Sequence, residues 1–388
     1  MKSIFKKVIA AAMALAMLLS LTACGGSDYT SANTEFVIGV SGPLTGGAAV
    51  YGTAVKNGAQ MAVDEINAAG GLNGVKFKLV ATDDTHDATK VAANYATMLE
   101  GGMQVSLGTV TTAPGLEFSK LSVEDNVFFI TPSASGDDIP QYDNGFQMCF
   151  ADGNQGKVAA DYVNSLGLDS IGIFYKSDDA YSNGIYKQFK ENLDSSTKTV
   201  EAVFTDANAT DFSAQITTLK DCKFIFMPIY YTPASIFMTQ AKDIVAADAV
   251  YYGCDGFDGL AGQFEDFSII PQEVSMLSHF DSNATEGAAA DFIKKYTEKH
   301  GTETLNQFGA SAYDCVYAIY NAMKAAMEDG KEIDVTISAS DLCDILKEQF
   351  TGDFTFSGVT GNGVKWEDNG YVSKEAVKYT LKQANSAN

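Results

Sequence analysis

The sequence contains no arginine. Its 26 basic residues are all lysines, and they face 49 aspartates and glutamates, which gives a formal net charge of -23. A chain this acidic repels phosphate backbones, so we expect no nucleic-acid partner. Without arginine, the bidentate guanidinium contact to a carboxylate is not available. A carboxylate ligand would therefore have to be held by hydroxyl groups, backbone N–H groups or lysine.

Residues that carry catalytic chemistry are scarce as well. There are three histidines, and none is spaced from a cysteine or another histidine as metal ligands are. The chain has no G-x-S-x-G motif, no Walker A motif and no G-x-G-x-x-G after a strand. We therefore expect no metal, no cofactor and no catalytic residue. One enzymatic alternative stays open, an acid–base pair formed by Asp255 and Asp258.

Long apolar runs are missing except near the N-terminus. There, lysines precede the apolar stretch Val8–Leu19, which is too short to span a bilayer comfortably and is typical of a signal peptide. The following Leu21-Thr22-Ala23-Cys24 resembles a bacterial lipobox. We expect a lipoprotein signal peptide at 1–23, a lipid on Cys24 and a tether at 24–34. The alternative is an ordinary signal peptide with an incidental cysteine. No other segment predicts a transmembrane helix.

Five cysteines remain after Cys24, widely spaced and without a C-x-x-C motif. Export permits disulfides, but an odd number leaves at least one cysteine without a partner in the chain. The simpler interpretation is that all five are small buried apolar residues. They are Cys149, Cys222, Cys254, Cys315 and Cys343.

Short β-branched or aromatic runs alternate with amphipathic helical stretches along the chain. This alternation is typical of βαβ units and a parallel sheet. It occurs twice, so the fold class predicted is α/β with two lobes. The segment between them, Phe146–Phe150, itself has the composition of a strand, which indicates a hinge continuous with the sheets. The predicted strands are Phe36–Val40, Phe77–Val80, Val105–Leu107 and Val127–Ile130, then Ile171–Tyr175, Val200–Phe204, Phe224–Met227 and Val250–Tyr252.

Hydroxyl side chains follow two strands of the first lobe. Thr111 and Thr112 come just before a predicted helix, and Ser133 and Ser135 follow the next strand. Ligands of open α/β sheets bind at the carboxyl ends of the strands. Hydroxyls and the free N–H groups of a helix start suit a carboxylate. The alternative is plain N-capping by these hydroxyls.

The second lobe offers complementary groups at its own strand ends. Asp255 follows one strand and could meet an ammonium group. Tyr181 and Tyr230 follow two others, with Tyr231 an equally placed alternative to Tyr230. Aromatic walls with one carboxylate form a receptor for a zwitterion or a cation.

Several motifs resemble the branched-chain amino-acid-binding proteins of ABC transporters, which have the type I periplasmic-binding-protein fold. They are SGPLTG at 41–46, AVDEINAAGG at 62–71, Asp83-Asp84, ITPS at 130–133 and AYD at 312–314. The resemblance covers about residues 36 to 381. It implies two doubly wound parallel-sheet lobes joined by a multi-strand hinge. One lobe would contain residues 35–148 and 280–371, and the other residues 149–279 and 372–388.

The resemblance also implies roles for individual residues. Thr112 stands where the family has a serine that binds the ligand carboxylate, and Asp255 replaces a glutamate that pairs with the α-ammonium group. Ser133 would supply backbone contacts, and the Ser135 hydroxyl would contact the ligand. The complete predicted ligand site is Tyr51, Thr111, Thr112, Ser133, Ala134, Ser135, Tyr181, Tyr230, Asp255 and Phe257.

The sequence departs from this family at two places near the site. Where some members have a disulfide between the loop after the second strand and the end of the third, this chain has His86 and Thr111. In addition, Ala113-Pro114 replaces a serine-rich run, which removes hydroxyls from the carboxylate site.

The function expected is that of a monomeric, lipid-anchored, extracytoplasmic binding protein. It would capture an amino acid, branched-chain or related, between its lobes and deliver it to an ABC permease without chemical change. Two alternatives remain within the same class. One is a ligand-sensing domain that feeds a signalling receptor, and the other is a binder of an amide or an aromatic acid.

Overall fold

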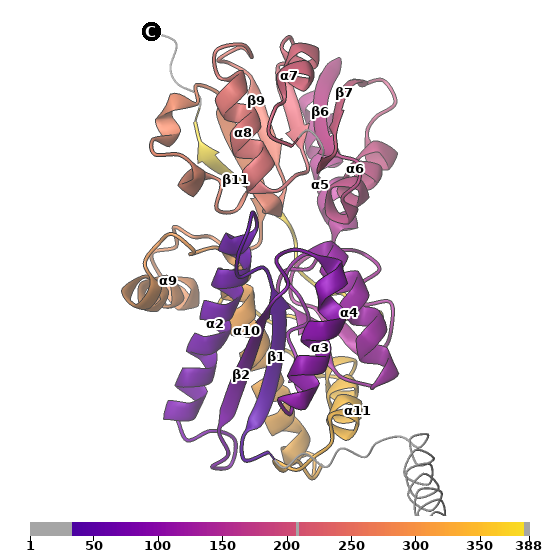
Figure 1. The fold of residues 1–388 in the computed structure, drawn as a ribbon, viewed down its shortest axis with the longest axis vertical. Helices are drawn as coiled ribbons and strands as arrows, with labels where there is room; N and C mark the ends of the chain where they lie inside the picture. The colour runs from indigo at the N-terminus through magenta and orange to yellow at the C-terminus, as the bar shows by residue number, and fades with distance from the viewer. Residues whose placement is uncertain (1–32, 207–208, 384–388) are drawn as a thin grey trace, which may run out of the picture.

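The computed structural model describes residues 33–206 and 209–383. The chain forms two α/β lobes stacked end to end (Figure 1), each built on its own, mostly parallel sheet. This confirms the predicted fold class. The predicted signal peptide, Cys24 and nearly all of the tether lie outside the described residues.

The first lobe contains a five-stranded sheet in the order β2-β1-β3-β4-β5, with every pair parallel. Three helices connect its strands, and three later helices pack onto the same lobe. The strands are β1 (Phe36–Gly42), β2 (Phe77–Asp83), β3 (Val105–Ser106), β4 (Phe129–Thr131) and β5 (Gly145–Gln147). The helices are α2 (Ala49–Ala68), α3 (Val91–Glu100), α4 (Thr112–Glu124), α9 (Gly287–His300), α10 (Gln307–Glu328) and α11 (Ala339–Phe350), and η1 (Ala88–Lys90) precedes α3.

The second lobe contains a six-stranded sheet in the order β11-β10-β9-β8-β6-β7. Its strands are β6 (Ser170–Lys176), β7 (Lys198–Phe204), β8 (Phe224–Met227), β9 (Val250–Gly253), β10 (Glu273–Ser278) and β11 (Val377–Lys382). Its helices are α5 (Asp152–Leu166), α6 (Ala180–Asn192), α7 (Ser213–Leu219) and α8 (Tyr231–Ala241), with short turns η3 (Asp255–Phe257), η4 (Ala261–Gln263) and η5 (Phe267–Ile269).

One strand departs from the predicted parallel arrangement. β11 pairs antiparallel with β10, whereas the other pairs of this sheet are parallel. A parallel neighbour requires a crossover connection over the sheet. β11 instead enters from the first lobe, directly beside the end of β10, and runs back along it.

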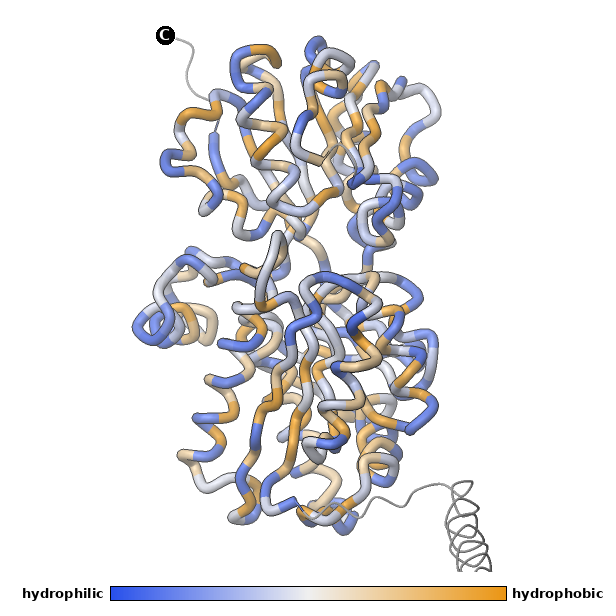
Figure 2. Tube along the Cα trace, in the orientation of Figure 1, coloured by the Kyte–Doolittle hydropathy of each residue, from blue (hydrophilic) through white to orange (hydrophobic). Residues whose placement is uncertain are grey.

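Buried apolar strands form the centre of each lobe, and Figure 2 shows hydrophobic residues concentrated there. In the first lobe, α10 lies directly against α2. Their backbones meet at Gly58, where a side chain would overlap the carbonyl oxygen of Gly309. Glycine is required at such a close approach. This contact fixes the start of α10 against the middle of α2.

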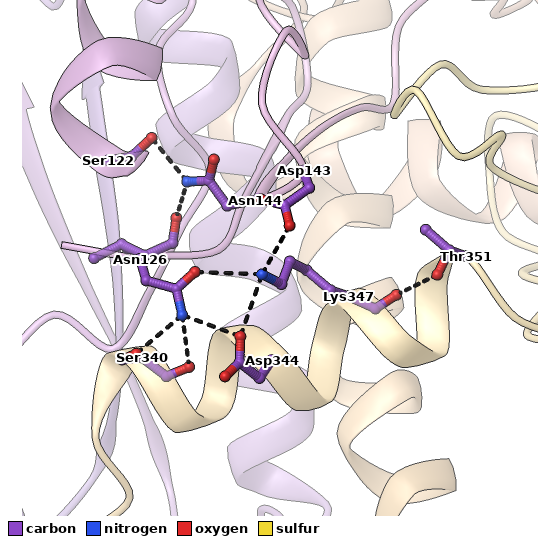
Figure 3. A network of polar contacts seen from close by, with 9 residues as sticks. Ser122, Asn126, Asp143, Asn144, Ser340, Asp344, Lys347 and Thr351 are labelled. Carbon is purple, nitrogen blue, oxygen red and sulfur yellow. Dashed lines mark hydrogen bonds and ion pairs between the residues drawn. The ribbon is translucent and has the colours of Figure 1, made fainter. Parts of the chain in front are cut away.

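A polar network attaches α11 to the opposite end of the first lobe (Figure 3). The Asn126 side-chain amide donates to Ser340 Oγ at 2.9 Å and to Asp344 Oδ1 at 3.1 Å. Lys347 Nζ donates to Asn126 Oδ1 at 3.4 Å and to Asp143 Oδ2 at 3.1 Å. The network holds the helix against the loops that precede β4 and β5, remote from the second lobe (Figure 1).

The chain passes between the lobes three times, after β5, after β10 and before β11. The predicted boundaries at 148/149, 279/280 and 371/372 fall in these connections, and they remain predictions. The Trp366 indole N–H, shortly before the third connection, donates to the carbonyl oxygen of Gln147, the last residue of β5, at 2.7 Å. Three separate connections therefore join the two lobes.

The five cysteines of the described residues are all buried and unpaired. This confirms the simpler interpretation, in which they act as small apolar side chains. Within residues 33–206 and 209–383, no helix has the length and apolar character needed to cross a bilayer.

Candidate functional site

A small pocket lies between the lobes, where the carboxyl ends of the two sheets face each other. Its empty volume is about 210 Å³. In each sheet the strand order changes direction, between β1 and β3 and between β6 and β8. Such switch points are where ligands of open α/β sheets bind. The lining residues are Tyr51, Val110, Thr111, Thr112, Ser133, Ser135, Tyr181, Tyr230, Asp255, Gly256 and Phe308.

Eight of the ten residues predicted for the site line this pocket, and two do not. Ala134 is buried in an apolar cluster behind the wall, packed with Phe118 and Ile139. Phe257 is fully buried in the core, and its ring lies so close to Gly253 that a side chain there would overlap it. Each adjoins a pocket residue in the sequence, but its side chain points into its own lobe.

Three lining residues were missed by sequence reasoning. Val110 and Gly256 adjoin predicted residues, so a wider window around Thr111 and Asp255 would have included them. Phe308 lies at the start of α10, far along the chain from any predicted site residue. It reaches the pocket because α10 packs along α2, and its ring meets Tyr51 edge-on with centroids 5.0 Å apart.

The first lobe presents hydrogen-bond donors at the start of α4. The first N–H groups of a helix have no acceptor inside it, and Pro114 in the third helical position has no N–H. Thr111 occupies the N-cap position, but its hydroxyl makes no capping bond. The plain N-capping interpretation is therefore wrong for Thr111. The backbone N–H groups of Thr112 and Ala113 remain for another acceptor.

The hydroxyls around these N–H groups have distinct partners. Thr112 Oγ1 donates to Asp152 Oδ2 at 3.3 Å, across the gap between the lobes. Ser133 Oγ donates to the Val110 carbonyl oxygen at 2.7 Å, which fixes one strand end against the next. The Ser135 carbonyl oxygen accepts from the Asp152 N–H at 2.7 Å. These bonds position the wall of the first lobe relative to the start of α5.

Asp255 supplies a buried carboxylate on the opposite wall. It begins η3, directly after β9, and is 2% exposed. Tyr181 Oη donates to its Oδ1 at 2.6 Å, and its own N–H donates to Gln155 Oε1 at 2.9 Å. Burial raises the pKa of Asp255 to about 6, although the bond from Tyr181 opposes this rise. No basic side chain is among the described residues that line the pocket.

Further acids surround the pocket without lining it. Burial, reinforced by the charge of Asp255, raises the pKa of Asp152 well above its ordinary value. Burial also raises the pKa of Asp258 to about 7. Asp258 Oδ2 accepts from the Gln307 N–H at 2.9 Å and thereby caps α10. Asp258 therefore does not line the pocket with Asp255, and its carboxylate binds the start of α10 instead.

Aromatic side chains form the rest of the enclosure. The Tyr181 and Tyr230 rings are stacked, with centroids 4.5 Å apart and planes inclined by 14°. The Tyr51 ring lies 5.8 Å from that of Tyr230. These rings come from both lobes, so the aromatic enclosure is complete only when the lobes are together.

Direct bonds between the lobes show that the cleft is closed. Val50 N–H donates to Tyr231 Oη at 3.2 Å, and Thr232 Oγ1 donates to the Gly47 carbonyl oxygen at 2.7 Å. These contacts join the start of α2 to the start of α8 beside the pocket. A ligand of the pocket would be enclosed on both sides.

The sequence profile of the family described as periplasmic binding protein matches residues 35–372. The chain belongs to this family. Its members are solute-binding proteins, and the match spans the two lobes and the pocket between them.

This periplasmic binding protein is also similar to individual solute-binding proteins. A Leu/Ile/Val-binding protein of Rhizobium johnstonii is 30% identical over 368 residues, covering 89% of this chain and 95% of the relative. The crystal structure of a branched-chain amino acid transporter substrate-binding protein from Streptococcus pneumoniae, in complex with isoleucine, has a TM-score of 0.74 at 27% identity, covering 89% of this chain and 100% of that one. A solute-binding protein of an R. palustris ABC transporter, in complex with benzoate, has a TM-score of 0.75 at 17% identity, covering 91% and 95%.

A hydrogen bond next to the pocket joins two segments of the first lobe in this periplasmic binding protein. His86 Nδ1 lies 2.9 Å from Thr111 Oγ1, so the bond joins the segment after β2 to the segment after β3. The imidazole also meets the Tyr230 ring edge-on at 5.2 Å between centroids. His86 was not predicted as a site residue, because its importance depends on contacts with two distant segments.

Proposed function

We propose that this periplasmic binding protein captures a free amino acid, branched-chain or related, between its lobes. The observation that carries the proposal is Asp255, a buried carboxylate that faces a pocket without any basic side chain among the described residues. A lone carboxylate in a closed cleft is costly without a cationic partner. The α-ammonium group of the ligand is the partner that this arrangement requires.

The opposite wall supports a place for the ligand carboxylate. The N–H groups of Thr112 and Ala113 stand at the positive end of the α4 dipole. Thr112 and Ser135 line the pocket, and Ala113 follows Thr112 in the first turn of α4. An amino acid would thus place its carboxylate on the first lobe and its ammonium group on the second. A ligand held at both ends stabilises the closed form.

The mechanism is closure, and no covalent step is involved. The ligand would bind the donors of the first lobe first and gain Asp255, Tyr181 and Tyr230 when the hinge closes. Only the difference in affinity between the closed and open forms shifts this equilibrium. The interlobe bonds of Tyr51 and Tyr231 add to that difference.

The cellular setting completes the proposal. The lipobox-like Leu21-Thr22-Ala23-Cys24 supports a lipid anchor on the outer side of the cytoplasmic membrane, with the monomer delivering its ligand to an ABC permease. A Cys24→Ala variant, expressed in a bacterium that processes lipoproteins, should be released from the membrane and still bind ligand. A processed variant that remains membrane-bound would exclude lipidation at Cys24.

The shared fold does not by itself select the ligand, because a benzoate-binding protein has the same fold. Two measurements would identify the ligand. Mass spectrometry of the small molecules released from the denatured purified protein should identify an amino acid. Calorimetry should then compare that amino acid with its des-amino analogue, using the wild type and Asp255→Asn. Recovery of a chemically converted product would instead point to an enzyme.

In this double cycle, we expect Asp255→Asn to weaken amino-acid binding by on the order of 2–5 kcal/mol, as when a buried charge pair is broken. The same variant should bind the des-amino analogue at least as well as the wild type does, because the analogue leaves Asp255 unpaired. A coupling free energy near zero would refute the amino-acid proposal and favour an amine-free ligand.

A further inference from the structure

Thr111 has the backbone conformation of an N-cap residue, but its side chain does not form the capping hydrogen bond. Its φ of -118° and ψ of 153° are extended, as in residues that precede a helix, and its hydroxyl makes no bond to the start of α4. An N-cap hydroxyl ordinarily accepts from the second or third helical N–H. The third residue is Pro114, which has none, so the only target left is the N–H of Ala113.

The contact with His86 explains why the Thr111 hydroxyl does not cap α4. The Nδ1 of His86 lies 2.9 Å from Thr111 Oγ1, so the hydroxyl is directed away from α4. His86 and Thr111 both belong to the first lobe, in the segments after β2 and β3, so this bond does not require closure. His86 is held in place by its own backbone, because its N–H donates to Asp84 Oδ1 at 2.9 Å.

The second lobe completes the surroundings of His86 when the cleft closes. The Tyr230 ring packs against the imidazole, and Asp179 Oδ1 lies 3.9 Å from its Nε2. A carboxylate on the Nε2 side favours a proton on that nitrogen. In the neutral imidazole, Nδ1 is then the acceptor, and Thr111 donates to it.

We propose that His86 is a positioning residue of the ligand site, which holds the Thr111 hydroxyl off the start of α4 so that the N–H of Ala113 stays free for the ligand. The inference rests on the proposed function, in which these N–H groups receive the ligand carboxylate. Without His86, the Thr111 hydroxyl would rotate onto Ala113 and compete with the ligand for the same donor.

The proposal predicts effects of opposite sign on stability and binding. Loss of His86 lets Thr111 cap the helix, so the ligand-free protein should keep or raise its melting temperature while its affinity falls. A merely structural histidine would lower both. The variant of choice is His86→Asn, because His86 has a φ of 64° and asparagine tolerates this left-handed conformation well. His300→Asn, the same substitution on α9, is the matched control.

The first experiment needs no ligand. Amide hydrogen exchange, followed by NMR, should show the Ala113 N–H exchanging at least several-fold more slowly in His86→Asn than in the wild type. The slowing should disappear in His86→Asn/Thr111→Val, which has no hydroxyl to form the cap. Unchanged exchange at Ala113 in His86→Asn would overturn the proposal, whatever the ligand is.

The second experiment measures affinity for L-isoleucine by calorimetry. His86→Asn should weaken binding by about three- to tenfold in the wild-type background and have no effect in the Thr111→Val background. Equal losses in both backgrounds would show that His86 does not act through Thr111. If the wild type does not bind isoleucine, that result counts against the proposed ligand class, and the exchange experiment still decides the role of His86.

Discussion

Tyr51 in the first lobe donates its phenol proton to the carbonyl oxygen of Gly256 in the second, with the two oxygens 2.5 Å apart. The same phenol oxygen accepts from the Tyr231 N–H at 3.4 Å. Gly256 lies next to Asp255 in η3, so this bond connects the start of α2 with the turn that carries the buried carboxylate. Closure of the lobes and positioning of Asp255 are therefore linked by one side chain.

Replacement of Tyr51 by phenylalanine keeps the ring packing and removes this bond. A neutral hydrogen bond contributes about 0.5–1.5 kcal/mol, so ligand affinity should fall by about two- to twelvefold. Calorimetry measures the loss, and small-angle scattering should show that more ligand is needed to close the cleft. Tyr186→Phe, which removes a surface bond to Glu201, is the control. Equal affinity for Tyr51→Phe and this control would show that the interlobe bond does not assist binding.

Ligand affinity should depend on pH through Asp255. Burial in the closed cleft raises the pKa of its carboxyl to about 6, so the closed form without ligand carries a neutral Asp255 at lower pH. An ammonium ligand needs the ionised form, so binding should be about tenfold weaker at pH 5 than at pH 8. Titrations at several pH values measure this dependence. Asp255→Asn should bind weakly with no such pH dependence, and a flat profile for the wild type would contradict the assigned role.

Stability of the first lobe should depend on the network around Asn126, which has a φ of 48°. Asn126→Ala loses the bonds to Ser340 and Asp344 and also places alanine in a left-handed conformation. Asn126→Gly loses the same bonds without that strain, so it should be more stable than Asn126→Ala by about 1 kcal/mol. Urea denaturation compares the two. Ligand affinity should be unchanged in both, because the network is remote from the cleft.

The sequence alone was sufficient for the parts of the site that follow directly from sheet topology. Asp255, Tyr181 and Thr112 could be predicted because each follows a strand, and the carboxyl ends of parallel strands meet at one edge. Phe308 could not, because its place depends on the packing of α10 along α2. The sequence also could not predict the direction in which a side chain points. Ala134 adjoins Ser133 and Ser135 in the chain, yet it faces the core.

The fold, like the site, could be predicted from the sequence only in part. Alternating strands and helices predicted two α/β lobes, but not the antiparallel β11, because pairing direction depends on the path of the chain through the hinge. The bond between His86 and Thr111 also joins separate segments, which sequence patterns do not bring together.

Asp84 provides a test of how buried acids affect the stability of this protein. Its side chain is fully buried after β2, where Ser41 Oγ donates to Oδ2 at 3.0 Å and the His86 N–H donates to Oδ1. Burial is the largest influence on its pKa, which is raised to about 6 despite these bonds. The unfolded chain has a carboxyl pKa of about 3.9. The native state therefore keeps this proton to higher pH than the unfolded state does.

The sign of the effect follows from this difference. Where the native state binds more protons, the free energy of unfolding decreases as pH rises, here between about pH 4 and pH 6, and the loss persists above that range. Asp84→Asn cannot ionise, so it should be more stable than the wild type at pH 7.5 and not at pH 4.5. We expect a gain of about 1–2 kcal/mol, because about 1.4 kcal/mol per pKa unit is partly offset by a weakened bond to Ser41. Urea denaturation of both proteins at the two pH values measures this gain in the free energy of unfolding. A difference between the proteins that is the same at both pH values would show that ionisation of Asp84 does not limit stability.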